Sequence, residues 1–275
     1  MRVFTQSRTL TKQTTRSGPP LIIVALAFVG GLFLIIPIVA LLQRAPWSDL
    51  GGLLTDKAAT QALRLSLVCS FGATLLALIT GVPLAWVIAR ANFPGRRLLR
   101  ALVILPLILP PVAGGVALLL AFGRQGLVGA PLFDWLGLQL PFTTIGAMLA
   151  ETFVALPFLV ITVESGFRSI DRSYEDAART LGAKPRFIFR RITLPLLAPS
   201  IAAGAVLAWA RALGEFGATI TFAGSVAGRT QTLPLAVFFD LGFDPDRAIA
   251  LSVILVFISI LILVSLRERW LTPLR

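Results

Sequence analysis

The sequence predicts an all-α, multi-pass membrane protein with six transmembrane helices. Its 275 residues are 56% hydrophobic and only 14% charged, and the mean hydropathy is +0.87. Soluble domains average about 25% charged residues, so this chain lacks the charge that a soluble surface needs. Long apolar runs alternate with shorter segments rich in arginine, which is the pattern of helices that cross a bilayer and the loops that join them.

Six apolar runs are long enough to span a bilayer at about 1.5 Å per helical residue. The first is too long for a secretory signal peptide and has no clear small-residue cleavage site after it, so we expect it to be retained. The expected spans cover residues 21–43, 62–89, 101–122, 142–163, 196–217 and 247–266. They predict one transmembrane domain over residues 21–266, with tails at 1–20 and 267–275.

The third expected span is interrupted by several residues that disfavour a regular helix. These are Pro106, Pro110, Pro111, Gly114 and Gly115. Backbone groups freed at membrane depth must be satisfied by protein or water. An ordinary proline kink and a helix break that faces a transport pathway both fit this pattern.

The basic residues are distributed unevenly between the two sides of the six spans. Of the 25 lysines and arginines, 18 fall in the two tails, in residues 90–100 and in residues 168–191, all on the same side. The positive-inside rule places that side in the cytoplasm. Both termini and the long charged loop at residues 168–195 are therefore predicted to be cytoplasmic, and the net charge of +12 reflects membrane orientation rather than nucleic-acid binding.

The composition excludes several kinds of site. The chain has no histidine, and its single cysteine, Cys69, lies in an apolar run, so we expect neither a metal centre nor a disulfide within the chain. None of its three lysines follows a glycine, so no Walker A loop can be formed. If this protein uses ATP, another chain must bind the nucleotide.

The charged segment at residues 171–199 predicts one short helix, from Tyr174 to Leu181, on the membrane surface. Ser173 and Asp176 fit a capping box at its start, with Glu175 and Asp176 in the first turn, where negative charge favours the helix dipole. Gly182 is suited to the left-handed position after the helix, and Pro185 prevents its continuation. A helix of about two turns is marginal alone and needs a surface to pack against.

This segment resembles the cytoplasmic loop of permease subunits from bacterial ABC importers. Those loops read E-A-A, three residues, G, nine residues, I-x-L-P, and here the run Asp176-Ala177-Ala178, then Gly182, then Ile192-Thr193-Leu194-Pro195 keeps both spacings. Asp176 stands where the family usually has Glu, although Glu175 precedes it. The alternative is a plain basic amphipathic helix on the membrane surface.

The resemblance implies a type I ABC importer architecture in which residues 168–195 hold a coupling helix that docks in a cleft of the ATPase subunit. The residues implied in this coupling are Glu175, Asp176, Ala177, Ala178, Gly182, Ile192, Leu194 and Pro195.

A second motif lies in the fifth expected span. Arg211 and Glu215 are four residues apart, so they share one face of a helix and can form an ion pair. A charge near the middle of a bilayer costs about 2.5–3.5 kcal/mol on insertion scales, which makes an intramembrane pair a candidate functional site. A pair that lies close to the outer interface and snorkels to it is the alternative. Gly214 and Gly217 flank Glu215 and permit close helix contact or a break.

The second motif is similar to the A-R-x-x-G-E-F/Y-G of permeases for molybdate, tungstate and sulfate, and the residues that follow it, 218–236, are closer to the molybdate branch. This implies translocation of an oxyanion, with molybdate favoured over tungstate or sulfate. The implied pathway or gate residues are Arg211, Gly214, Glu215, Thr219 and Thr221. Hydroxyl donors suit an oxyanion pathway better than a deep fixed cation, which would trap a dianion.

The resemblance also implies partners. We expect a homodimer of this chain, two ATPase subunits that carry ATP and Mg at the cytoplasmic face, and an extracytoplasmic substrate-binding protein, all at a bacterial inner membrane. No cofactor is expected on this chain. An intramembrane enzyme would need Glu151 and Glu215 to meet, and a channel or secondary transporter has no use for a capped cytoplasmic helix.

Overall fold

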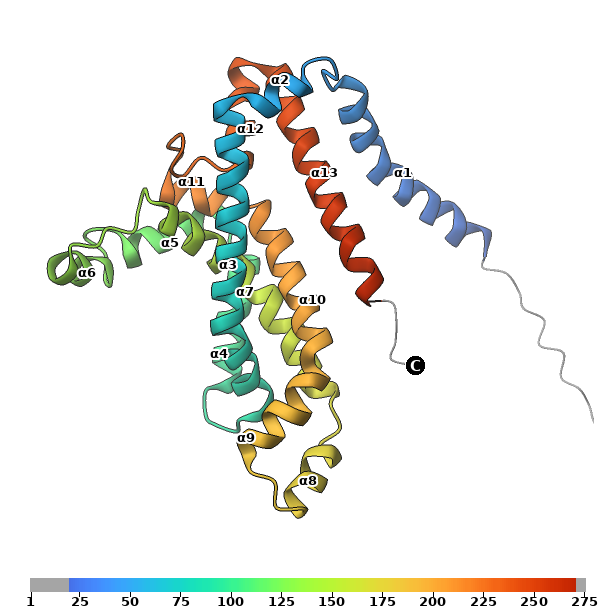
Figure 1. The fold of residues 1–275 in the computed structure, drawn as a ribbon, viewed down its shortest axis with the longest axis vertical. Helices are drawn as coiled ribbons and strands as arrows, with labels where there is room; N and C mark the ends of the chain where they lie inside the picture. The colour runs from blue at the N-terminus through green and yellow to red at the C-terminus, as the bar shows by residue number, and fades with distance from the viewer. Residues whose placement is uncertain (1–19, 271–275) are drawn as a thin grey trace, which may run out of the picture. The chain divides into compact units, whose positions relative to one another are not determined.

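The computed structural model describes residues 20–270, and every regular element in that range is helical (Figure 1). The sequence expectation of an all-α membrane protein is confirmed. The elements are α1 (Leu21–Arg44), α2 (Leu50–Thr55), α3 (Lys57–Arg90), α4 (Arg96–Ile108), α5 (Pro111–Phe122), α6 (Gly129–Leu136), α7 (Thr144–Ser169), α8 (Ser173–Thr180), α9 (Pro185–Ile188), the π-helical turn η1 (Phe189–Thr193), α10 (Leu194–Leu213), α11 (Gly217–Ala223), α12 (Leu233–Phe243) and α13 (Pro245–Trp270).

The chain divides into two compact units at Arg44. The first contains α1, a helix of 24 residues with Pro37 inside it, which is apolar along its length and long enough to cross a bilayer. The second contains all the other helices, including the segments that the sequence singled out.

Helices α3, α7 and α10 form the centre of the second unit (Figure 1). Their buried contact residues are mostly small or β-branched, with Leu159 of α7 among the few larger ones. A Cβ placed on Gly81 of α3 would lie 2.6 Å from Leu159 Cδ2, and one on Gly204 of α10 would lie 3.2 Å from the Leu159 carbonyl oxygen. Helices in a membrane associate through such close packing, because lipid provides no hydrophobic drive to bring them together.

Five helices of the described range are long and apolar enough to cross a membrane. They correspond to five of the six expected spans, with the fifth extended to Pro185–Leu213. The remaining span, expected over residues 101–122, is divided into α4 and α5. Leu109 and Pro110 adopt extended conformations with ψ of 133° and 134°. Each precedes a proline, and the proline ring disfavours a helical conformation in the preceding residue, so the chain breaks here rather than kinking.

Several expected boundaries were wrong. The helix that includes the fifth span begins at Pro185 and ends at Leu213, because the π-helical turn lets the backbone continue through Leu194 and Pro195 without interruption. The loop expected at residues 218–246 contains α11 and α12, and the last helix extends to Trp270 instead of ending at 266. The tail expected at 1–20 lies outside the described residues except for Pro20, as do residues 271–275 of the C-terminal tail.

Two regions of the second unit lie at opposite ends of α3. Asp56 caps the first turn of α3 by accepting from the Ala59 N–H at 2.9 Å, and this bond is the main cause of the lowered pKa of the Asp56 carboxyl. Asp56 also pairs with Arg247 of α13 at 2.7 Å. Arg247 also pairs with Asp240 of α12. At the other end of α3 lies the loop with α8 and α9 (Figure 1). A helix of 34 residues separates these regions by about 50 Å.

Candidate functional site

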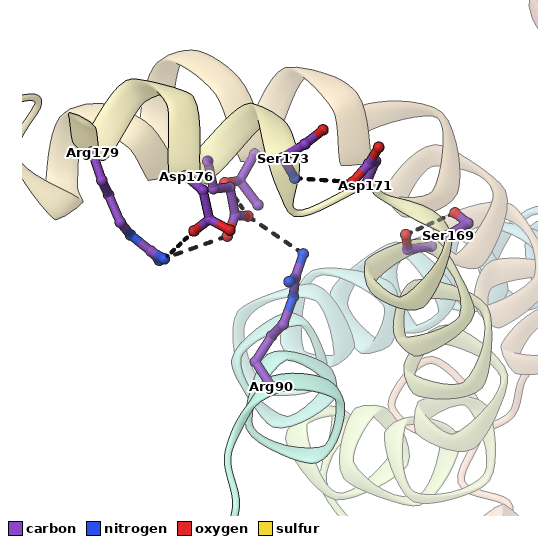
Figure 2. Close-up of polar contacts among 9 residues, drawn as sticks. Arg90, Ser169, Asp171, Ser173, Asp176 and Arg179 are labelled. Atoms are coloured by element: carbon purple, nitrogen blue, oxygen red, sulfur yellow. Dashed lines mark hydrogen bonds and ion pairs between the residues drawn. The ribbon is translucent and has the colours of Figure 1, made fainter. Parts of the chain in front are cut away.

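Helix α8 begins at Ser173, but Ser173 does not cap it. The Ser173 N–H donates to Asp171 Oδ1 at 2.9 Å, as Figure 2 shows, and this bond is the main cause of the lowered pKa of the Asp171 carboxyl. The capping box expected from Ser173 and Asp176 was therefore wrong. The Asp171 side chain accepts from the N–H two residues later in the chain, which is the same kind of local bond that a capping side chain forms. The helix begins at Ser173, one residue before the expected start at Tyr174.

Helix α8 ends as the sequence predicted. Gly182 has a φ of +81°, and its N–H donates to the Arg179 carbonyl at 2.9 Å, while the Ala183 N–H donates to the Ala178 carbonyl at 3.0 Å. These two bonds form a Schellman motif, which satisfies the last carbonyl groups of the helix. The short helix is therefore fixed at both ends by local bonds.

If α8 docks on an ATPase as the resemblance implies, we expect Gly182→Ala to weaken uptake and Gly182→Asn to preserve most of it. A Cβ at Gly182 would meet nothing within 4 Å, so the cost is confined to the left-handed backbone, about 1–2 kcal/mol for alanine. Asparagine tolerates this conformation better. Uptake into vesicles, compared at equal amounts of membrane-inserted protein, measures the effect. Equal uptake by the alanine and asparagine variants would show that the cap does not matter.

One face of α8 is apolar and exposed. It consists of Tyr174, Ala177, Ala178 and Leu181, spaced as one stripe of a helix, and we call it the outer stripe. Tyr174 is 59% exposed and Leu181 is 88% exposed, whereas Ala178 is half-buried. The sequence argument found the two alanines but missed Tyr174 and Leu181, although the spacing of three and four residues would have indicated them. The outer stripe is a small apolar surface with alanines at its centre.

The two acidic residues of α8 point in different directions. Asp176 is exposed and pairs with Arg179 at 2.8 Å, a contact visible in Figure 2. Glu175 is buried, and its Oε1 accepts from Thr193 Oγ1 at 2.9 Å and from Arg90 Nη2 at 3.4 Å. Figure 2 shows Arg90 reaching from the end of α3 toward α8. Sequence reasoning grouped the two acids together, but the fold separates them.

The second half of the first motif lies at the start of the long helix. Ile192 is in the π-helical turn, and Leu194 and Pro195 begin α10 with partly exposed side chains. Pro195 lies just after the π-helical turn, at the start of the regular part of this helix. Thr193, between them, is buried and bonds to Glu175. Sequence reasoning did not select Thr193, because it occupies the variable position of the motif.

Arg211 and Glu215 form the expected ion pair, with Nη2 and Oε2 2.5 Å apart. The helix does not continue through them, because α10 ends at Leu213 and Gly214 caps it. Glu215 lies in the short break before α11, where its Oε1 accepts from the Ala218 N–H at 2.8 Å. The Glu215 side chain is 1% exposed, whereas that of Arg211 is 27% exposed. One buried carboxylate therefore joins the end of α10 to the start of α11.

The two threonines after this break are held in different ways. Thr219 is fully buried in α11 and its Oγ1 has no partner within the described part of the chain. Thr221 is half-buried and donates to the Gly217 carbonyl at 2.8 Å. A Cβ on Gly115 of α5 would lie 2.6 Å from Thr221 Cβ, so the break in the third span brings α5 directly against α11.

The interior of the second unit also holds Glu151, on α7. It is 1% exposed, and its Oε2 has no hydrogen-bond partner among residues 20–270. Glu215, by contrast, is engaged by Arg211 and by the Ala218 N–H. Over the same residues no group of three His, Cys, Asp or Glu side chains could hold a metal ion.

Comparison with known proteins identifies the family. The family of binding-protein-dependent transport system inner membrane components matches residues 81–274. The chain belongs to this family. It is therefore a multi-pass inner-membrane transport subunit and not an enzyme, as the sequence predicted. The family match covers the helices that carry both motifs, from the end of α3 to α13.

Several curated relatives are similar over most of their length. The molybdenum transport system permease protein ModB of Mycobacterium tuberculosis is 46% identical over 248 residues, which is 90% of this chain and 93% of the relative. The protein of the same name from Escherichia coli is 41% identical over 77% of this chain and 92% of the relative. The sulfate transport system permease protein CysT of Salmonella typhimurium is 35% identical over 86% of each.

Solved structures share the fold. A chain of a bacterial ABC transporter that imports the acidic polysaccharide alginate superposes with a TM-score of 0.71 at 20% identity, covering 92% of this chain and 95% of that one. A chain of the MetNI methionine ABC transporter superposes with a TM-score of 0.60 at 19% identity, covering 77% and 94%. The architecture is that of type I ABC importer permeases, as the sequence predicted.

Proposed function

We propose that this chain is the membrane-spanning subunit of an ATP-driven importer of molybdate. The observation that carries the proposal is the 46% identity to a molybdenum transport permease over 90% of the chain. The lower identity to a sulfate permease makes sulfate an alternative substrate. Tungstate is another alternative, because it resembles molybdate in charge and shape.

The partners follow from this assignment. Two copies of the chain form a homodimer around the pathway, two ATPase subunits bind ATP and Mg at the cytoplasmic face, and an extracytoplasmic protein delivers the anion. A transporter of the same fold has been solved in complex with a ligand-bound periplasmic protein. The outer stripe of α8 supports ATPase docking, because small exposed apolar side chains at its centre allow a partner to approach the helix closely.

The assignment requires α8 and both termini to be cytoplasmic. We predict that a cysteine at Lys184, in a Cys69→Ser background, reacts only with thiol reagents that reach the cytoplasm, whereas a cysteine at Gly228 reacts from outside. Gly228 is exposed and lies near Gln61 in the second turn of α3, while α8 lies by the opposite end of α3. Labelling of both positions from one side would contradict this orientation.

The proposed function is tested by uptake into vesicles that contain the permease with its ATPase and are supplied with the binding protein. We expect ATP-dependent accumulation of molybdate, competition by tungstate and weaker competition by sulfate. Stronger competition by sulfate would move the assignment to the sulfate branch. Uptake that proceeds without ATP or the ATPase would indicate a channel or a secondary transporter instead.

A further inference from the structure

Helix α8 is attached to the membrane-spanning part of the chain by very little packing. Most of its residues are exposed, and Glu175 is the only one of its described side chains that is buried. A cleft of about 290 Å³ lies between α8 and the end of α3, and Arg90, Glu175, Arg179 and Thr193 are among the residues that line it. A helix this short cannot hold its place by its own stability. Its position must depend on a few specific contacts.

The contacts made by Glu175 join three elements at one carboxylate. Arg90 is the last residue of α3, and Thr193 is the last residue of the π-helical turn that continues into α10. The Arg90 and Glu175 side chains are only 11% and 12% exposed, so water competes weakly for their contact. Of the two bonds to Glu175 Oε1, that from Thr193 at 2.9 Å is the shorter, and that from Arg90 at 3.4 Å is longer than a typical charge-assisted bond. Arg179 is a weaker partner, since it is largely exposed and lies closer to Asp176.

Thr193 is the last residue of the π-helical turn and leads directly into α10. The Leu194 N–H bonds to the Phe189 carbonyl, five residues back, so one extra residue is accommodated in the turn. One extra residue rotates the helical residues that precede the turn by about 100° around the helix axis, relative to α10. Leu197, one turn after Thr193 and on the same face, packs in the core, and the buried Thr193 hydroxyl donates to Glu175 Oε1.

We propose that Arg90, Glu175 and Thr193 form a polar lock that sets the position of the coupling helix and transmits its movement to α3 and α10. The inference rests on the proposed function, because it assigns α8 to ATPase docking. It divides the acidic pair of α8 into two roles. Glu175 is a positioning residue that faces the membrane-spanning helices, and Asp176 remains on the side open to a partner.

The lock is tested first in the full-length permease without its partners, by hydrogen exchange of the amides of residues 173–181. Glu175→Gln, Arg90→Gln and Thr193→Val each remove one charge or one donor, and each is expected to speed this exchange about tenfold, the factor that corresponds to the loss of one charge-assisted bond. Thr193→Ser keeps the hydroxyl and is expected to exchange at the original rate. Asp176→Asn is the matched control on the exposed side; it loses only an exposed pair with Arg179 and should change the rate much less.

The second measurement is the number of ATP molecules hydrolysed per anion imported by the assembled transporter. With Thr193→Val and Glu175→Gln we expect this number to rise several-fold while the ATPase still copurifies; Thr193→Ser should restore it. Unchanged exchange in Glu175→Gln would overturn the lock, whatever the protein transports. Faster exchange with an unchanged ATP-to-anion ratio would overturn its role in transmission. If the unaltered complex showed no ATP-driven uptake, the proposed function would fail, while the exchange experiment would still decide whether the lock exists.

Discussion

Replacement of Glu215 with leucine is expected to prevent most of the protein from assembling and to remove ATP-driven uptake. The substitution leaves the Arg211 guanidinium without its counter-charge and the Ala218 N–H at the start of α11 without an acceptor. Breaking a buried ion pair costs about 3–5 kcal/mol, and losing a helix cap adds about 1 kcal/mol. Since typical domains are stable by only about 5–15 kcal/mol, the combined loss is severe.

The yield of monodisperse protein in detergent measures assembly, and uptake into vesicles measures function. Arg211→Leu is also expected to be harmful, because it leaves the Glu215 carboxylate, which is 1% exposed, without its counter-charge. The double variant Arg211→Leu, Glu215→Gln should recover much of the assembly, since neither charge remains and the glutamine oxygen can still accept from the N–H. Normal assembly of Glu215→Leu would show that this pair is not needed for the fold.

The same variants separate a structural pair from an anion-binding arginine. If the pair is structural, the assembled double variant should transport. If Arg211 touches the anion, the double variant should assemble but not transport, and Arg211→Lys should change the competition among molybdate, tungstate and sulfate. The 27% exposure of the Arg211 side chain, against 1% for Glu215, shows which partner faces open space.

Replacement of Ala177 with tryptophan is expected to uncouple the transporter completely. Ala177 is exposed at the centre of the outer stripe, so a larger side chain fits the permease alone but prevents close contact with the ATPase. Overpacking at a fitted surface costs about 1–3 kcal/mol or more, which corresponds to a loss of ATPase affinity of up to about two orders of magnitude. Ala178 is a poorer site for this test, because it is half-buried and tryptophan there would also disturb the permease itself.

A series of substitutions of increasing size at Ala177 provides the control. Ala177→Ser keeps the small size and should retain uptake, Ala177→Leu should be intermediate, and Ala177→Trp should reach background. Copurification of the ATPase should fall in the same order, while the yield of permease should not change. An Ala177→Trp protein with normal ATP-driven uptake would show that α8 does not dock in the ATPase.

The local features of the coupling segment could be predicted because they depend on neighbouring residues only. Gly182 adopts the left-handed conformation because the residues before it form a helix that must end, and glycine enters that conformation at the lowest cost. The break in the third span follows in the same way from the two consecutive prolines at 110 and 111. The predicted capping box was wrong although it also depends on neighbouring residues only. Both Asp171 and Ser173 can bond to backbone N–H groups at this end of the helix, and the bond that forms is from the Ser173 N–H to Asp171.

The membrane class, the two motifs and the family follow from the sequence itself, because apolar length, charge and spacing are properties of the chain. The roles of Glu175 and Thr193 were decided only by the tertiary structure. Glu175 meets Arg90, 85 residues away, and Thr193, 18 residues away, and no periodicity in the sequence links such positions. Likewise, the spacing of Arg211 and Glu215 indicated their pairing, but the end of α10 at Leu213 and the close contact of α11 with α5 gave Glu215 its second bond and its burial. A carboxylate at the junction of two helices satisfies both of them, and that junction exists only once the helices have packed.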